Sequence, residues 1–245
     1  MKELILDQVV TIPCHPKNRG GARGAEEIRY LVYHYTGNDG DTGANNAKYY
    51  RDNVVEASAH YFVDDHAVTR SVDELVVAWA VGGKKWRDCP QTGGGKLYGV
   101  VTNRNSLSIE LCDTRRDGTL MATEATLARG IELGKTLMEK YRIPVEHVVR
   151  HFDVTGKHCP AYFMDTEKWE RFKSRLVEEK REDEMKLYNY VNQMPAWARP
   201  SAEKAIRNGF IKMDETGAVG VWETNLQTLV WMDRAGLLDG PAREV

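Results

Sequence analysis

The feature that most constrains the fold is the alternation of strand-like and helix-like segments along the first 185 residues. Segments 28–35, 59–65 and 106–112 are rich in β-branched and aromatic residues, which is typical of strands. Segment 123–143 instead carries apolar residues at helical spacing and stops before Pro144. Because strands and helices are interleaved, the sequence predicts an α/β domain.

The chain changes character after this region. Residues 167–185 are charged and favour a helix that runs into a linker, and Pro195 and Pro200 then mark a new unit. Within that unit we expect two helices, over 201–210 and 223–238. We therefore predict a catalytic domain over residues 1–185 and a small helical domain over residues 186–245.

Composition excludes several classes of protein. Apolar residues make up 42% of the 245 residues and charged residues 29%, which is ordinary for a globular protein. The formal net charge of −2 carries no polybasic pattern, so we expect no nucleic-acid partner. No apolar run is long enough for membrane insertion. The first 16 residues lack a signal-peptide core, so we expect synthesis in the cytoplasm without a signal peptide.

The residues most suggestive of chemistry lie in HFDVTGKHCP (151–160), which supplies His151 and Cys159. Upstream, His34 stands at the end of a predicted strand. Two neutral imidazoles and a thiolate form a suitable zinc site, and three protein ligands leave the fourth position open, as in catalytic sites. A histidine and a cysteine at this spacing are more often unrelated, so the surrounding sequence has to decide.

That surrounding sequence is specific. The string VVRHFDVTGKHCP (148–160) closely resembles the signature of the N-acetylmuramoyl-L-alanine amidases of the type 2 amidase superfamily, especially phage and prophage endolysins. Four further stretches match the family in order: LVYHYTGN (31–38), SAHYFVDD (58–65), AWAVGG (78–83) and NSLSIELC (105–112). The resemblance covers about residues 20–170.

The resemblance implies a central mixed β-sheet flanked by helices, with a zinc cleft on one face. It implies zinc-dependent hydrolysis of the amide bond between N-acetylmuramic acid and L-alanine in peptidoglycan. His34, His151 and Cys159 would be the zinc ligands, and Glu110 and Lys157 would be the catalytic residues beside the metal. An endolysin of this kind would act on the cell wall after release from the cell.

The residue pattern agrees with these roles. Alternation in SLSIELC places Glu110 on the face opposite Leu107, Ile109 and Leu111. Glu110 can then take a proton from water and return it to the leaving amine, while Lys157 stabilises the developing oxyanion. In an alternative division of roles, Glu110 only orients the water.

Other residues near these motifs allow two interpretations. His60 can line the cleft and contact substrate, or it can simply pack in the interior. Trp79 can bind substrate by stacking on a sugar, or it can pack. We interpret Cys112 as a small buried side chain, because a fourth protein ligand would close the site. The segment 145–151 is β-branched and follows a proline, so we expect it to be extended.

The C-terminal unit lacks a catalytic cluster. It faintly resembles one helix pair of S-layer homology modules, which attach proteins to cell walls, so wall binding and self-association both remain open. Two other functions compete with the endolysin hypothesis: an intracellular amidase that recycles anhydro-muropeptides, and a non-catalytic muropeptide-binding module. Cys159 counts against the second, because such modules usually lack that cysteine.

Overall fold

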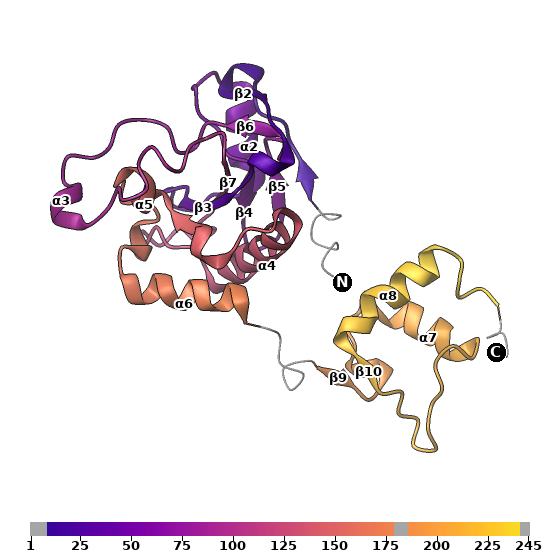
Figure 1. The fold of residues 1–245 in the computed structure, drawn as a ribbon. Helices are drawn as coiled ribbons and strands as arrows, with labels where there is room; N and C mark the ends of the chain where they lie inside the picture. Colours follow the sequence, from indigo (N-terminus) through magenta and orange to yellow (C-terminus); the bar gives the residue numbers. More distant parts are fainter. Residues whose placement is uncertain (1–8, 179–185, 241–245) are drawn as a thin grey trace. The chain divides into compact units, whose positions relative to one another are not determined.

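A computed structural model describes residues 9–178 and 186–240 of the chain. The start of the chain, on which the expectation about a signal peptide rests, and residues 179–185 of the predicted linker lie outside the described residues. The chain divides into two compact units, with the division between Glu178 and Glu179. Each unit is described separately below (Figure 1).

The larger unit is built on a six-stranded sheet with the order β1-β5-β4-β7-β3-β8. Strands β4 and β5 are antiparallel, and the other neighbouring strands run parallel, so the predicted mixed sheet is confirmed. The strands are β1 (Val10–Thr11), β3 (Tyr30–Tyr35), β4 (Tyr61–Val63), β5 (Val68–Arg70), β7 (Ser106–Leu111) and β8 (Val148–Arg150).

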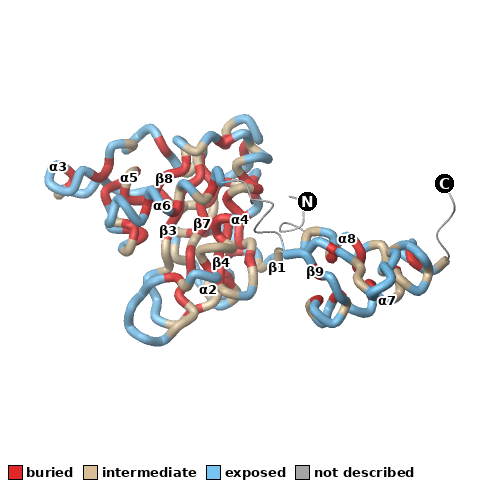
Figure 2. Tube along the Cα trace, turned by 90° about the horizontal axis from the view of Figure 1, so that it is seen from below, coloured by how far each residue is buried: buried red, intermediate tan, exposed pale blue. Residues whose placement is uncertain are grey.

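Helices α4 (Glu124–Tyr141) and α6 (Thr166–Val177) pack with one face of this sheet to form the main core. Alternation along β7 directs Leu107, Ile109 and Leu111 into that core, as the sequence predicts. Helix α6 contributes Trp169, Phe172 and Leu176, which share one side at helical spacing. Figure 2 shows the buried residues concentrated along β3, β7 and α4.

Shorter elements cover the opposite face of the sheet. Helix α2 (Gly43–Asp52) packs Ala47 beside Phe62 of β4, and α5 (His151–Thr155) follows β8 directly. The remaining elements of this unit are β2 (Arg19–Ala22), β6 (Val76–Ala78), α3 (Cys89–Thr92), η1 (Pro16–Asn18), η2 (Ala25–Glu27), η3 (Val145–His147) and η4 (Ala161–Phe163). Strands β2 and β6 pair antiparallel in a separate small sheet.

The expectation that residues 145–151 are extended is wrong at both ends of the segment. Residues Val145–His147 form a 3-10 turn, and helix α5 begins at His151. The helix begins there because Asp153 accepts a hydrogen bond from the backbone N–H of Arg150 over 2.8 Å. Only the strand between them, β8, is extended.

The smaller unit contains the two predicted helices, α7 (Arg199–Arg207) and α8 (Glu223–Arg234). It also contains η6 (Val191–Gln193) and a short antiparallel pair, β9 (Leu187–Tyr188) and β10 (Val221–Trp222). Its buried apolar side chains form a core of their own: Tyr188, Met194, Ala198, Ala202, Ala205, Val221, Leu226, Leu229, Val230 and Leu238. None of the described helices of the chain combines the length and apolarity that a membrane span requires.

Candidate metal centre

Neighbouring parallel strands place His34 and Glu110 together. The register of β3 and β7 pairs His34 with Glu110, so their side chains leave the same face of the sheet. That face lies opposite the main core, because Tyr33 and Ile109, one position earlier on each strand, are core residues. Nδ1 of His34 lies 3.9 Å from Oε1 of Glu110.

The turn after α5 brings His151 and Cys159 to the same place. The backbone N–H of Phe152 donates to the carbonyl of Cys159 over 3.1 Å, which holds the cysteine against the start of the helix. The turn requires Gly156, whose φ of 89° is left-handed. A Cβ atom there would also come within 2.3 Å of Sγ of Cys89.

His34, His151 and Cys159 form one buried cluster, in which one ligand atom from each residue lies within 4.8 Å of the other two. Nδ1 of His34 is 3.8 Å from Sγ of Cys159, and the two imidazole rings are 4.7 Å apart. Nε2 of His34 and Nδ1 of His151 are buried without a hydrogen-bond partner. Two buried imidazoles, each with an unsatisfied ring nitrogen, and a thiol close to one of them form a donor set that suits zinc.

The electrostatic environment favours neutral histidines, which is the form that binds metals. Burial, with a further contribution from the charge of Lys157, lowers the pKa of His151 to about 4. Burial also holds the pKa of His34 well below its ordinary value. Burial raises the pKa of the Cys159 thiol to about 12, so a metal must displace the thiol proton when it binds.

Glu110 lies beside the cluster with one free oxygen. Its side chain is 18% exposed, and its Oε2 atom is buried without a hydrogen-bond partner. Burial raises the pKa of this carboxyl to about 8, which the charge of Lys157 partly opposes and that of Asp41 reinforces. Glu110 thus presents an unoccupied acceptor next to His34.

Lys157 is exposed, but its charge acts on the cluster. It partly opposes the burial that raises the pKa values of Glu110 and Cys159. Its backbone carbonyl accepts a hydrogen bond from the N–H of Cys159 over 2.7 Å. The lysine is therefore held close to the proposed metal ligand in sequence and in space.

His60 is packed in the interior. The residue is 1% exposed, and its ring contacts Nη2 of Arg23 at 2.8 Å and Oγ of Ser108 at 2.9 Å. Burial, together with the charge of Arg23, lowers the pKa of His60 to about 3, so the ring is neutral. Both ring nitrogens of His60 have protein partners. Of the two roles that the sequence allows, this favours packing over contact with substrate.

Trp79 and Cys112 lie outside the cluster. Trp79 is half-buried, and a Cβ atom at Gly20 would come within 3.2 Å of its indole nitrogen, so the ring packs closely on that backbone. Cys112 is fully buried, and the side-chain amide of Asn46 donates to its sulfur over 3.7 Å. The cysteine therefore has the small, buried character expected of it.

Two residues near the site carry no sequence signal of their own. Asp41 is buried, and its charge raises the pKa of Glu110. The side-chain amide of Asn46 donates to the carboxylate of Asp41 over 2.5 Å. The hydroxyl of Tyr162 is buried without a hydrogen-bond partner, and its pKa is raised well above the ordinary value by burial and by the charges of Cys159 and Glu110. Asp41 lies in an irregular segment and Tyr162 in the three-residue η4, where periodicity gives no guidance.

An α/β fold with two buried histidines, a cysteine and a carboxylate on one face of the sheet defines a candidate metallohydrolase. The family model of the N-acetylmuramoyl-L-alanine amidases matches residues 24–162, which is more than half of the chain. The chain belongs to this family.

Individual relatives agree with this assignment. The N-acetylmuramoyl-L-alanine amidase BlyA of Bacillus subtilis (strain 168) is 31% identical over 172 residues, which cover 67% of this chain and 45% of BlyA. The structure of the catalytic domain of XlyA aligns with a TM-score of 0.53 and 28% identity over 69% of this chain and 98% of that domain. A mutant endolysin from Bacillus subtilis aligns equally well, with a TM-score of 0.53 and 26% identity over 69% of this chain and 97% of the endolysin.

The matches also differ in extent. This chain spans less than half the length of BlyA, whereas it covers nearly all of the XlyA catalytic domain. The chain is therefore similar to part of BlyA and to nearly the whole of the solved XlyA domain. The family match ends at residue 162, so it does not reach the smaller unit of this chain.

Proposed function

We propose that this protein is a zinc-dependent N-acetylmuramoyl-L-alanine amidase that acts on bacterial peptidoglycan as a phage or prophage endolysin. The observation that carries the proposal is the convergence of His34, His151 and Cys159 beside Glu110, in a chain that belongs to the amidase family. The substrate would be the amide bond between N-acetylmuramic acid and the first L-alanine of the stem peptide.

His34, His151 and Cys159 would hold the zinc ion. When bound, zinc supplies a Lewis acid that polarises the scissile carbonyl and increases the acidity of water. Three protein ligands leave room for substrate, which supports a catalytic rather than a structural site. The orphaned ring nitrogens of the two histidines support the assignment, because buried polar atoms ordinarily have partners.

Glu110 would carry the proton through the reaction. Its free Oε2 takes a proton from the attacking water as the oxygen forms a bond with the carbonyl carbon. When the carbon–nitrogen bond breaks, Glu110 delivers that proton to the departing nitrogen of L-alanine. Lys157 supplies positive charge near the oxygen that becomes negative between these steps.

The amidase assay should use two substrates. Purified walls and soluble anhydro-muropeptides distinguish an endolysin from a recycling amidase, because only the endolysin is expected to prefer walls. We expect release of free L-alanine amino groups from walls, together with about one zinc per chain by elemental analysis. The Cys159→Ser protein is the matched control, since it removes one ligand at nearly constant side-chain size. Binding of muropeptide without hydrolysis would contradict the proposal and favour the non-catalytic alternative.

The smaller unit is proposed as a separate domain that serves wall attachment. Its core is formed by its own residues, and none of the proposed site residues lies within it. Its faint similarity to S-layer homology modules supports wall binding. Self-association is the competing role, and light scattering of the full chain tests it.

A further inference from the structure

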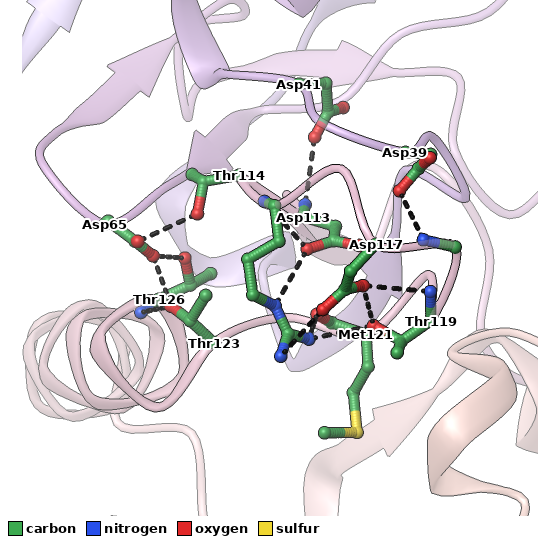
Figure 3. A network of polar contacts seen from close by, with 12 residues as sticks. Asp39, Asp41, Asp65, Asp113, Thr114, Asp117, Thr119, Met121, Thr123 and Thr126 are labelled. Atoms are coloured by element: carbon green, nitrogen blue, oxygen red, sulfur yellow. Dashed lines mark hydrogen bonds and ion pairs between the residues drawn. The ribbon is translucent and has the colours of Figure 1, made fainter.

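Three aspartates from the two loops that follow β3 and β7 meet in a second cluster. Asp39 belongs to the loop between β3 and α2, while Asp113 and Asp117 belong to the loop that follows β7. One carboxylate oxygen from each lies within 4.8 Å of the other two (Figure 3). We propose that this cluster, which we call the aspartate site, binds a calcium ion.

The aspartate site contains a buried oxygen that the protein leaves unsatisfied. Asp113 is 3% exposed, and its Oδ1 accepts a hydrogen bond from the backbone N–H of Arg115 over 3.1 Å. Its Oδ2 is also buried but has no hydrogen-bond partner. An unpaired oxygen on a buried carboxylate is costly, and coordination of a cation removes that cost. This oxygen is evidence for a ligand that is independent of the clustering of charge.

The neighbouring Arg115 forms ion pairs with two of the three aspartates and satisfies the aspartate site only in part. Arg115 approaches Asp113 and Asp117 only to 3.5 Å in each case, which is too long for a strong hydrogen bond. Its Nη2 instead donates to Oγ1 of Thr119 and to the carbonyl of Met121. The three carboxylates outnumber the one guanidinium that pairs with them, so the aspartate site keeps a net negative charge that favours a cation.

Oxygen donors and their spacing favour calcium. The site offers neither a thiol nor an imidazole, so it does not suit zinc. Calcium binds oxygen at about 2.3–2.6 Å, so two of its ligands can be up to about 5 Å apart, whereas magnesium at about 2.1 Å requires a closer approach. Asp39 and Asp117 are exposed, so water can complete the coordination.

Calcium at this position would link the two loops that follow β3 and β7, the strands that carry His34 and Glu110. The first loop begins after Tyr35 at the end of β3, and the second begins after Leu111 at the end of β7. The loops are already joined by hydrogen bonds: Gly118 N–H donates to Asp39 over 3.0 Å, and Asp113 N–H donates to Asp41 over 2.9 Å. We expect calcium to stabilise the loops at the carboxyl ends of β3 and β7, whether or not the chain is an amidase.

Calorimetric titration of the full-length, zinc-loaded protein with calcium chloride tests the proposal. We expect one calcium per chain with a dissociation constant of about 10⁻⁴ to 10⁻³ M, the range of extracellular calcium modules, and weaker binding of magnesium. Calcium should also raise the temperature of thermal unfolding. Asp39→Asn and Asp117→Asn should each weaken calcium binding at least about tenfold, because each removes a charged ligand.

Asp39→Asn and Asp117→Asn are the informative variants, because both side chains are exposed and the fold should tolerate the change. Asp113→Asn would instead alter a buried group. Asp52→Asn is the matched control, since that exposed aspartate of α2 pairs with Arg51 and lies outside the aspartate site. Binding that is equally tight in Asp39→Asn, Asp117→Asn and the parent would overturn the site. Absence of calcium binding at about 10 mM would do the same, because that concentration exceeds the expected constant at least about tenfold. Release of zinc during the titration would show that calcium acts at the His34 cluster and would also contradict the proposal.

Discussion

Nδ1 of His34 lies 3.9 Å from Oε1 of Glu110, because the parallel register of β3 and β7 sets the two residues side by side. The contact leaves Oε2 of Glu110 without a partner and next to the candidate metal ligands. A carboxylate in this position can exchange protons with water at the site. Glu110 is therefore the residue whose replacement most directly tests the proposed mechanism.

We predict that Glu110→Gln keeps the fold and the zinc but lowers the rate of hydrolysis at least about 100-fold, the lower range for general acid–base catalysis. The amide cannot accept the proton of water, although it has nearly the same shape. Zinc content, the circular dichroism spectrum and the turnover of soluble muropeptide measure the three properties. Glu27→Gln, at a half-buried carboxylate paired with Arg104, is the control and should leave the rate unchanged. Near-normal turnover by Glu110→Gln would mean that Glu110 only orients the water.

Metal removal gives a second prediction. Cys159→Ser should lose most of its zinc and its activity, because a serine hydroxyl is a poor substitute for a thiolate ligand. Dialysis of the parent against a chelator should abolish activity, and stoichiometric zinc should restore it in the parent alone. Cys112→Ser is the control at a second buried cysteine, which lies outside the cluster. Retention of zinc and activity by Cys159→Ser would disprove the assignment of the third ligand.

The success of the sequence predictions depends on how local the signal is. Strand β7 and helix α4 could be predicted because each carries its own period, two residues in the strand and about 3.6 in the helix. Strands β1 and β9 have only two residues each, which is too short for any periodicity. Their formation depends on distant partners, such as the pairing of Val10 with Thr69.

The candidate site shows the same division. His34, Glu110, His151 and Cys159 lie in motifs shared with a known family, so the sequence could identify them. The orphaned oxygen of Asp113 and the buried hydroxyl of Tyr162 are properties of the three-dimensional structure, with no counterpart in spacing. His60 shows the opposite difficulty, because a family motif marks it while its contacts with Arg23 and Ser108 place it in the interior.

Glu74 provides a prediction about stability and its dependence on pH. This buried carboxylate accepts hydrogen bonds from the hydroxyls of Tyr61 and Tyr141. It also forms an ion pair with Lys140, with Nζ 2.5 Å from Oε2. Although burial alone would raise the pKa of Glu74, these contacts hold it below its ordinary value. The carboxylate therefore stabilises the fold at neutral pH, and Glu74→Gln should lower the free energy of unfolding by about 2 kcal/mol.

The sign of the pH effect follows from the lowered pKa. The stabilisation is complete above the pKa of an unfolded glutamate, about 4.3, and is lost as the pH falls through the lower pKa of the folded state. Urea unfolding should therefore show a constant difference between Glu74→Gln and the parent from about pH 8 to 5, and a smaller difference below about pH 4. The pair of half-buried Glu27 and exposed Arg104 is the control, and Glu27→Gln should change stability less at every pH. A difference that grows in acid would contradict the assignment.

The last prediction concerns the independence of the larger unit. All five proposed site residues, at positions 34, 110, 151, 157 and 159, precede the division between Glu178 and Glu179. The buried side chains of the smaller unit form a separate core. A protein truncated after Glu178 should therefore fold, bind about one zinc and hydrolyse soluble muropeptides at the rate of the full chain.

The truncated protein also separates the two roles proposed for the smaller unit. If residues 186–240 attach the enzyme to walls, truncation should reduce the fraction that sediments with purified walls and spare turnover of the soluble substrate. If they mediate self-association, truncation should instead lower the molar mass by light scattering by more than the mass of the removed residues. The full-length Cys159→Ser protein is the control for sedimentation, since it keeps the smaller unit and lacks the proposed zinc site. An insoluble or zinc-free truncated protein would show that the smaller unit completes the catalytic fold, and the two-domain proposal would then be wrong.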